Sequence, residues 1–299
     1  MNGGSQTGRV IQWFPGHMAK TFRMIQAELR NVDVVIELLD ARTPFSSKNP
    51  MFEQLTKGKP KLTLLNKSDL AEPDATKEWI AYYNKSDINA LSVISKDKKT
   101  RDEVIGVVGR IMRPLKEKKA SRGIKNLRTR AMLLGIPNVG KSTLINTLAL
   151  GAPTKVADKP GVTRGKQWID AGEIELLDMP GALWPKFENK TIADHLAFLG
   201  AVNDDIIDLT DLALRLISEL RTGFGRALGG RYGVGINCSN TELEILELIA
   251  RKRGMLISGG EVDYERAAVM LFDELRAGKL GRISLERVSD IKKLSVYEK

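Results

Sequence analysis

Short runs of aliphatic residues alternate with amphipathic stretches through the first 187 residues. Five such runs predict buried β-strands, over residues 32–39, 61–65, 91–94, 131–134 and 174–177. Apolar residues at helical spacing predict a helix over 20–30, before the first strand. Strands interleaved with helices predict a parallel sheet with helices on both faces, which is an α/β domain.

From about residue 188 the pattern is purely helical. Apolar positions predict helices over 192–199, 206–220, 241–253 and 264–277. Thr241 and Glu244 form a capping box at the start of the third helix, and Gly254 is placed to end it. Residues 280–299 show no such pattern and are predicted to be loosely held. We therefore expect an α/β domain over 1–187 and an all-α domain over 188–299.

Composition excludes several classes of protein. Cys238 is the only cysteine and there are two histidines, so a disulfide framework is impossible and a zinc site is improbable. No apolar run approaches the length of a membrane span. The net charge of +10 is unevenly distributed, because residues 1–187 carry +12 and residues 188–299 carry −2. Residues 96–130 are the most basic segment, which favours a polyanionic partner there, although a solvated charged surface is the alternative.

A phosphate-binding loop is predicted at residues 135–142, which read GIPNVGKS and match GxxxxGK(S/T). The loop follows a predicted strand and opens a predicted helix, as this motif requires. Lys141 is expected to reach the β- and γ-phosphates of a nucleotide, and the Ser142 hydroxyl to bind Mg²⁺. The expected phosphate-binding residues are Pro137, Asn138, Val139, Gly140, Lys141, Ser142 and Thr143.

Two further segments are expected to face the same phosphates. Asp178, at the end of the predicted strand over 174–177, can hold the Mg²⁺ shell, and the Gly181 N–H can sense a γ-phosphate. Thr163 lies between the phosphate loop and Asp178, and its hydroxyl is expected to complete the Mg²⁺ sphere; the alternative is an incidental threonine in a Pro-Gly turn. The predicted metal ligands are thus Ser142, Thr163 and Asp178.

Base recognition is predicted at residues 66–69, which read NKSD after the strand over 61–65. The carboxylate of Asp69 can accept hydrogen bonds from N1 and N2 of guanine, a donor pair that adenine lacks. Asn66 belongs to the same motif, and the stem of Lys67 is expected to pack along the base. Ser95 and Lys96, after the strand over 91–94, are expected to complete the base pocket, or else to form an ordinary turn.

The order of these motifs is permuted. NKSD precedes the phosphate loop, whereas ordinary GTPases have it last. The site still assembles, because all these loops leave the carboxyl ends of parallel strands. Residues 113–127 must then join the two ends of the ordinary order, and their composition suggests an exposed connector.

The chain resembles the circularly permuted GTPases of the YlqF/RbgA type over nearly its whole length. The resemblance rests on WFPGHM at 13–18, DARTP at 40–44, NKSD at 66–69, the loop at 135–142, PGVTR at 160–164 and DMPG at 178–181. It implies a cytoplasmic bacterial GTPase that binds GTP, GDP and Mg²⁺ and acts on the large ribosomal subunit and its rRNA late in assembly. No membrane partner is implied, and we expect a monomer when the protein is free.

The resemblance also implies a C-terminal helical domain similar to ANTAR RNA-binding modules. Because that domain is slightly acidic here, contact with RNA would have to be local. Residues 251–253, which read RKR at a helix end, are the candidate. Favourable interaction of these cations with the helix dipole is the alternative explanation.

The position that usually orients the attacking water has no suitable side chain in this chain. Many GTPases place a glutamine just after DxxG to orient water, but this chain has Ala182 and Leu183. We therefore expect slow basal hydrolysis. In related GTPases an asparagine at the place of Asn138 helps to bind K⁺, and the imidazole of His17 can position or polarise water. Docking of the N-terminal arm or contact with RNA is the alternative role of His17. The predicted catalytic set is therefore His17, Asn138 and Lys141, with the role of His17 open.

Three functions compete at this point. The first is a GTP-hydrolysing assembly factor for the large ribosomal subunit, stimulated by ribosomal particles. The second is a GTP-dependent RNA-binding scaffold in which turnover is incidental. The third, a small-molecule P-loop kinase, is disfavoured by the NKSD motif.

Overall fold

The computed structural model describes residues 16–86, 88–123, 128–150, 167–187 and 189–295. Within them the chain forms a six-stranded sheet with the order β3-β2-β1-β4-β6-β5. The strands are β1 (Val34–Asp40), β2 (Lys61–Asn66), β3 (Asn89–Ser92), β4 (Thr129–Gly135), β5 (Gln167–Asp170) and β6 (Ile174–Asp178). All five predicted strands are present, and the predicted α/β fold is confirmed.

The sheet differs from the prediction at one edge. β5 was not predicted, and it pairs with β6 in the antiparallel direction, so the sheet is mostly rather than wholly parallel. Only Ile169 of its four residues is buried, and Trp168 is exposed. A four-residue edge strand with one inward side chain has no aliphatic run by which it could be recognised.

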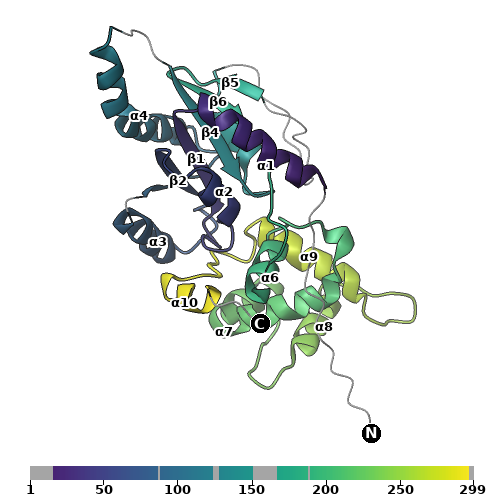
Figure 1. Ribbon diagram of the computed structural model, residues 1–299. Coiled ribbons are helices and arrows are strands. Elements are labelled where there is room, and N and C mark those ends of the chain that lie inside the picture. Colours follow the sequence, from purple (N-terminus) through teal and green to yellow (C-terminus); the bar gives the residue numbers. More distant parts are fainter. Residues whose placement is uncertain (1–15, 87, 124–127, 151–166, 188, 296–299) are drawn as a thin grey trace.

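Helices cover both faces of the sheet (Figure 1). Val35 of β1 belongs to an apolar cluster with residues of α1 (Gly16–Glu28) and α2 (Pro50–Leu55). Ile36, which points to the opposite face, belongs to a cluster with residues of α4 (Lys99–Ala120) and α5 (Lys141–Leu148). α3 (Pro73–Lys85) packs beside Leu39 and Leu65. Burial on both faces explains why these strands read as continuous aliphatic runs.

The helical part lies beyond the carboxyl ends of the strands (Figure 1). Its main helices are α6 (Lys190–Phe198), α7 (Leu209–Tyr232), α8 (Glu242–Lys252) and α9 (Tyr264–Arg276). All four were predicted, and the capping box at Thr241 and Glu244 is formed. α7 continues past its predicted end through a kink at Phe224, because Leu228 and Tyr232 still bury their side chains.

α6 connects the two apolar cores. Ala193 and Leu196 belong to the cluster of the sheet, whereas Ala197 and Phe198 belong to the cluster of the helical part. The predicted division between residues 187 and 188 stays a proposal, since α6 contributes to both sides of it.

The prediction of a loosely held tail was wrong for residues 280–295. The Ile283 N–H donates to the Leu70 carbonyl and the Leu285 N–H to the Arg42 carbonyl, each at 2.9 Å. Leu294, in α10 (Ile291–Leu294), is buried, and α10 lies below α3 in Figure 1. These contacts join segments more than 200 residues apart, which leave no periodic signal in the tail itself.

The predicted connector is also largely helical. Residues 113–120 form the last two turns of α4, and Pro114 lies inside that helix. A helix in this stretch was not predicted, but no residue of 113–120 is buried, which fits an exposed connector; residues 124–127 lie outside the described part. Among the described helices, none is long and apolar enough to cross a membrane.

Candidate functional site

The register of the sheet aligns the ends of the motif-bearing strands. Asp40 pairs with Asn66, Leu38 with Gly135, and Leu133 with Asp178. The loops that follow β1, β2, β4 and β6 therefore leave the same edge of the sheet. This is the edge at which ligands bind in open α/β sheets.

The phosphate loop connects β4 to α5 as predicted. Gly140 has a φ of +96°, and a Cβ at this position would clash with the amide nitrogen of Asn66. Only glycine fits both the backbone conformation and the space. The same Asn66 amide donates to the Val139 carbonyl at 2.7 Å, so the base-recognition motif holds the phosphate loop directly.

Lys141 begins α5 and is buried. Its ammonium donates to the carbonyls of Gly135 and Ile136, both at 3.1 Å. Burial lowers the pKa of Lys141 to about 8, and the charge of Asp178 partly opposes that effect. A buried ammonium held by two neutral carbonyls gains a strong charge-assisted partner when an anionic phosphate enters the loop.

Asp178 ends β6 opposite this lysine. Its Oδ1 atom is buried and has no hydrogen-bond partner, and burial raises the pKa of Asp178 to about 6, with partial opposition from Lys141. An unsatisfied buried carboxylate oxygen is costly, and it is what a hard cation requires. Ser142 in the first turn of α5 supplies a hydroxyl, so the described residues fit Mg²⁺. Thr163 lies outside the described residues.

Mg²⁺ at this place would depend on the nucleotide as well as on the protein. The described residues contain no group of three or more His, Cys, Asp or Glu side chains that could hold a metal ion. Mg²⁺ commonly binds through one or two protein ligands together with substrate phosphates. A carboxylate and a hydroxyl next to a phosphate loop match that pattern.

The DMPG loop lies directly against the phosphate loop. A Cβ at Gly181 would be 2.8 Å from the ammonium of Lys141 and 3.0 Å from the Pro137 nitrogen. The next two residues, Ala182 and Leu183, are fully buried in apolar clusters. Neither can orient a water molecule, which agrees with the expectation from the sequence.

The predicted base-binding loops also meet. Asn66 accepts hydrogen bonds from the Ser95 N–H at 3.0 Å and from the Ser95 hydroxyl at 2.7 Å. Asp69 and Lys96 are exposed in these same two loops. Asn66 therefore joins the two loops, while Asp69 presents its carboxylate to solvent, where a base can reach it.

Two residues of the site have unusual backbone conformations. Lys67 and Asn138 have φ values of +58° and +60°, and neither is glycine. The Lys67 ammonium donates to the Asn138 carbonyl at 2.7 Å, which joins the two strained loops. Such outliers cluster at functional sites, where the surroundings hold them in place.

Asp40 and Arg42 form a buried pair to which the sequence analysis gave no role. Arg42 donates to both carboxylate oxygens of Asp40, at 2.9 and 2.8 Å, and the Lys67 ammonium lies 3.0 Å from the same carboxylate. Burial alone would raise the pKa of Asp40, but Arg42 and Lys67 hold it well below its usual range. Arg42 also donates to the Leu275 carbonyl at 3.0 Å, which ties Lys67 to the last turn of α9.

The phosphate loop itself contacts the helical part. The side-chain amide of Asn138 donates to the Gly200 carbonyl, just after α6. Nearby, Arg276 of α9 binds both carboxylate oxygens of Asp204 and the carbonyls of Ala197 and Phe198. The nucleotide loops are therefore bonded to the ends of α6 and α9 by two separate routes.

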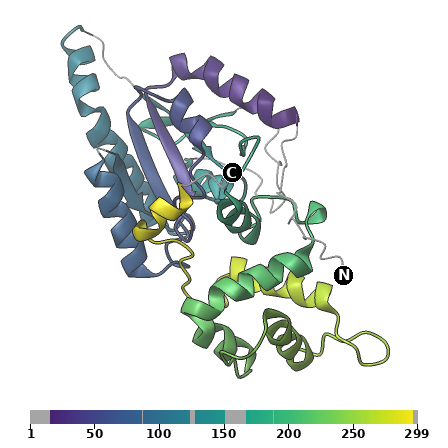
Figure 2. The ribbon, with the colours of Figure 1, turned by 60° about the horizontal axis from the view of Figure 1, so that its bottom comes forward.

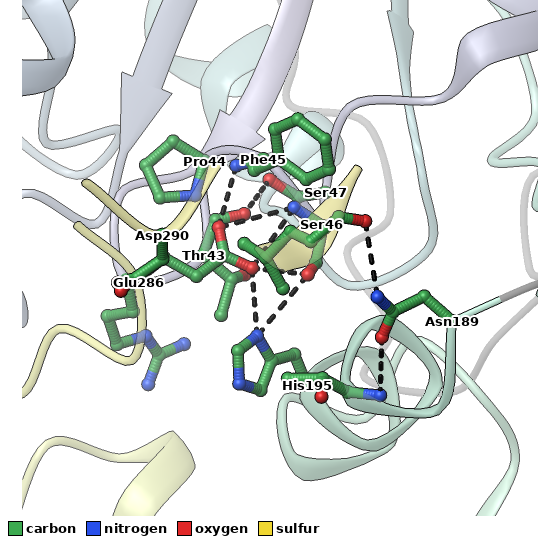
Figure 3. Close-up of polar contacts among 12 residues, drawn as sticks. Thr43, Pro44, Phe45, Ser46, Ser47, Asn189, His195, Glu286 and Asp290 are labelled. Carbon is green, nitrogen blue, oxygen red and sulfur yellow. Dashed lines mark hydrogen bonds and ion pairs between the residues drawn. The ribbon is translucent and has the colours of Figure 1, made fainter. Parts of the chain in front are cut away.

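A buried ionic cluster forms a second junction (Figure 3). The carboxylate of Glu286, in the C-terminal segment, accepts hydrogen bonds from the Phe45 N–H at 2.7 Å and from the Ser46 N–H at 3.2 Å. The Ser46 hydroxyl also donates to it. The imidazole of His195 in α6 bonds to Glu286 at 2.8 Å and to Glu219 of α7 at 2.9 Å.

Two carboxylates keep this buried imidazole charged. Burial favours the neutral form of His195, but the hydrogen bonds and charges of Glu219 and Glu286 raise its pKa to about 10. No sequence pattern predicted this cluster, since Glu286 falls in the segment predicted to be loosely held. A glutamate next to a serine in a polar tail gives no local signal of burial.

Two predicted features, His17 and the basic cluster at 251–253, have no described environment or make other contacts. His17 lies in the first turn of α1, and its side chain is outside the described part. Of the basic cluster at 251–253, Arg251 pairs with Glu247 at 2.8 Å, and Arg253 donates to the Arg231 carbonyl and lies over the Tyr232 ring. These intramolecular contacts favour the structural explanation for that cluster.

Comparison with known proteins gives consistent matches. The family model described as 50S ribosome-binding GTPase matches residues 130–229. The ribosome biogenesis GTPase A of Bacillus cereus is 41% identical over 293 residues, which cover 95% of this chain and 99% of that protein. The mitochondrial ribosome-associated GTPase 1 of Mus musculus is 32% identical, over 93% of this chain and 90% of that protein.

Two solved structures of YlqF are also similar to this chain. The GDP-bound structure of TM YlqF has a TM-score of 0.65 and 29% identity, and the match covers 90% of this chain and 100% of that one. The GNP-bound YlqF from T. maritima has a TM-score of 0.62 and 28% identity, covering 90% of this chain and 98% of that one.

Proposed function

Because this chain belongs to the ribosome biogenesis GTPase A family, we propose that the site at the carboxyl edge of its sheet binds and hydrolyses GTP to promote assembly of the large ribosomal subunit. The family model for 50S ribosome-binding GTPases supports the same activity and partner. The observation that carries the assignment to this site is Asn66, which bonds at once to the phosphate loop and to the Ser95 loop. One side chain thereby joins the loop proposed to bind phosphate and the loops proposed to bind the base.

The roles of the site residues follow from their positions. The Lys141 ammonium and the backbone N–H groups at the start of α5 bind the phosphates, and Asp69 selects guanine. Ser142, Asp178 and Thr163 are the proposed Mg²⁺ ligands; the bound ion would neutralise charge on the β- and γ-phosphates. GTP and GDP are supported as ligands by the GDP- and GNP-bound relatives. Gly181 senses the γ-phosphate through its N–H.

K⁺ activation is proposed through Asn138. Its amide nitrogen is used by Gly200, which leaves the amide oxygen as the group that can face a cation. We expect hydrolysis to slow when Na⁺ replaces K⁺, and the Asn138→Ala variant to lose that difference. Multiple-turnover phosphate release in matched chloride salts measures both. Equal wild-type rates in the two salts would exclude a role for K⁺.

Hydrolysis is proposed to be slow until the protein meets the ribosome. Buried Ala182 and Leu183 cannot position water, and a positioning or acid–base group typically contributes about 10²–10⁴ in rate. We expect large subunits to stimulate single-turnover hydrolysis in the wild type, and His17→Ala to lose most of that stimulation while keeping GTP affinity and subunit binding.

The same experiment separates the alternatives. If His17→Ala keeps the stimulated rate, RNA or K⁺ alone positions the water. If the variant loses subunit binding, His17 is a docking residue. If wild-type subunit binding depends on GTP but hydrolysis is never stimulated, the protein is a GTP-dependent RNA-binding scaffold.

The domain division, the role of the helical part, the RNA contact, the location and the oligomeric state are also proposals. The division into domains at residues 187 and 188 rests on the change in pattern, and an ANTAR-like role of the helical part rests on the resemblance. Ribosomal RNA as the direct contact is supported by the basic charge of the first part of the chain. A cytoplasmic location and a monomeric free state also stay predictions, since the relatives include bacterial and mitochondrial GTPases.

A further inference from the structure

The C-terminal half of α4 has few partners in the described molecule, since Leu115 packs at the edge of the core and Lys119 pairs with Asp33. Its buried residues Thr100, Val104, Val108 and Met112 recur every four positions, and none of the helix residues after Met112 is buried. A helix of this length spans about 33 Å. Figures 1 and 2 both show its far end extending beyond the sheet. The core therefore accounts for Leu115 but not for the charged residues in the last turns of α4.

This half of the helix is strongly basic. Residues 110–123 contain six Lys or Arg residues and one acidic residue, Glu117. Lys119 pairs with Asp33 at 3.2 Å. The structure shows no ion pair between any described residue and the other five, which are Arg110, Arg113, Lys116, Lys118 and Arg122. Stabilisation of the helix dipole explains cations in the last turn only, which leaves Arg110 and Arg113 unexplained.

The cations share one face with two glycines. Gly106, Gly109, Arg110 and Arg113 follow each other at spacings that place them on the side of α4 opposite its buried residues, and Lys116, three positions after Arg113, extends this row at its edge. A Cβ at either glycine would have nothing within 4 Å. Internal packing therefore does not require these glycines, although each costs a helix interior about 0.5–1 kcal/mol relative to alanine.

We propose that this face of α4, defined by Gly106, Gly109, Arg110, Arg113 and Lys116, is a docking surface for the sugar–phosphate backbone of RNA. Neighbouring cations on a helix face lie about 5–6 Å apart at their Cβ atoms, and a row of them complements a row of phosphates. The glycines let the RNA backbone approach the helix closely. The inference rests on the proposed function, which brings the protein to a ribosomal particle.

RNA is favoured over a protein partner because none of the large exposed apolar residues of the described chain lies on α4. Protein interfaces usually have an apolar core with few charges, whereas interfaces with nucleic acid are strongly positive. Two residues of the alternative basic cluster at 251–253, Arg251 and Arg253, already make intramolecular contacts, so α4 is the better supported surface.

The test compares two triple variants of the full chain. Arg110→Ala/Arg113→Ala/Lys116→Ala removes the row of cations, and Lys57→Ala/Lys85→Ala/Lys279→Ala removes the same charge from exposed lysines elsewhere. Binding to large ribosomal subunits is measured by co-sedimentation with a non-hydrolysable GTP analogue over a series of salt concentrations. We expect at least tenfold weaker binding for the α4 variant. Its salt slope should fall by about 2–3, since each lost phosphate contact removes roughly 0.7–0.9.

The control variant should bind within twofold of the wild type, and both variants should keep wild-type GTP affinity, because the row of cations begins about 16 Å along the helix from its nucleotide end. Equal loss in both variants, or none in the α4 variant, would overturn the proposal. Weaker binding with an unchanged salt slope would indicate a protein contact and also overturn it. If the wild type fails to bind subunits at all, the proposed function is at fault rather than this surface.

A second variant tests the close approach without changing charge. Gly106→Ala/Gly109→Ala should raise the Tm of the free protein, because alanine favours the helix, and should weaken subunit binding several-fold. Unchanged subunit affinity in this variant would contradict the approach of the RNA backbone that the proposal requires.

Discussion

Asp69→Asn should convert the protein from a guanine-specific to a xanthine-binding nucleotide site. The Asp69 carboxylate is exposed in the loop after β2, where it can accept from N1 and N2 of guanine. Hydrogen bonds to a charged group contribute about 1.5–3 kcal/mol each. Loss of two such bonds corresponds to about 10²- to 10⁴-fold weaker GTP binding. The asparagine amide can instead donate to the C2 oxygen of xanthine.

Titration of GTP and of xanthosine triphosphate into wild type and variant measures the switch. The control is Asp74→Asn, which removes an exposed carboxylate in the first turn of α3 and should change neither affinity. A variant that keeps wild-type GTP affinity would remove Asp69 from the base pocket. A variant that loses GTP without gaining the xanthosine nucleotide would show that the loop has been disturbed instead.

Most strands could be predicted because both of their faces are buried. All seven residues of β1 are buried, so the strand appears in the sequence as an aliphatic run. β5 escaped prediction since three of its four residues are exposed. The capping box at Thr241 and Glu244 could also be predicted, because its two partners lie within one turn of each other in the sequence.

The residues of the candidate site also differ in how far they could be predicted from the sequence. The phosphate loop and NKSD carry their chemistry in contiguous residues, so the sequence alone reveals them, although their contact with a nucleotide stays a prediction. Arg42 and Leu275 are 233 positions apart, and Phe45 and Glu286 are 241 apart. No pattern in either segment indicates its partner. Contacts that join the nucleotide loops to the helical part therefore required the structure.

The second large effect is expected at Glu286. Its buried carboxylate is shared by the Phe45 and Ser46 N–H groups, the Ser46 hydroxyl and the charged imidazole of His195. Removal of one partner from a buried ion pair typically costs about 3–5 kcal/mol, because the other charge is left uncompensated. Glu286→Gln keeps the shape and should lower the free energy of unfolding by about that amount at pH 7. Glu219→Gln, at the half-exposed partner of the same imidazole, is the matched control and should cost about 1 kcal/mol.

The pH dependence separates this ionic role from loss of packing. The pKa of His195 is raised to about 10 in the folded protein, against about 6.5 for an unperturbed histidine. A raised pKa contributes stability that is complete below pH 6.5 and is lost as pH rises towards 10. The difference in unfolding free energy between wild type and Glu286→Gln should therefore shrink between pH 7 and pH 9.5, as measured by urea unfolding at each pH. A difference that stays constant over this range would show that Glu286 acts through its backbone contacts, and that the charge on His195 does not stabilise the junction between α6 and the C-terminal segment.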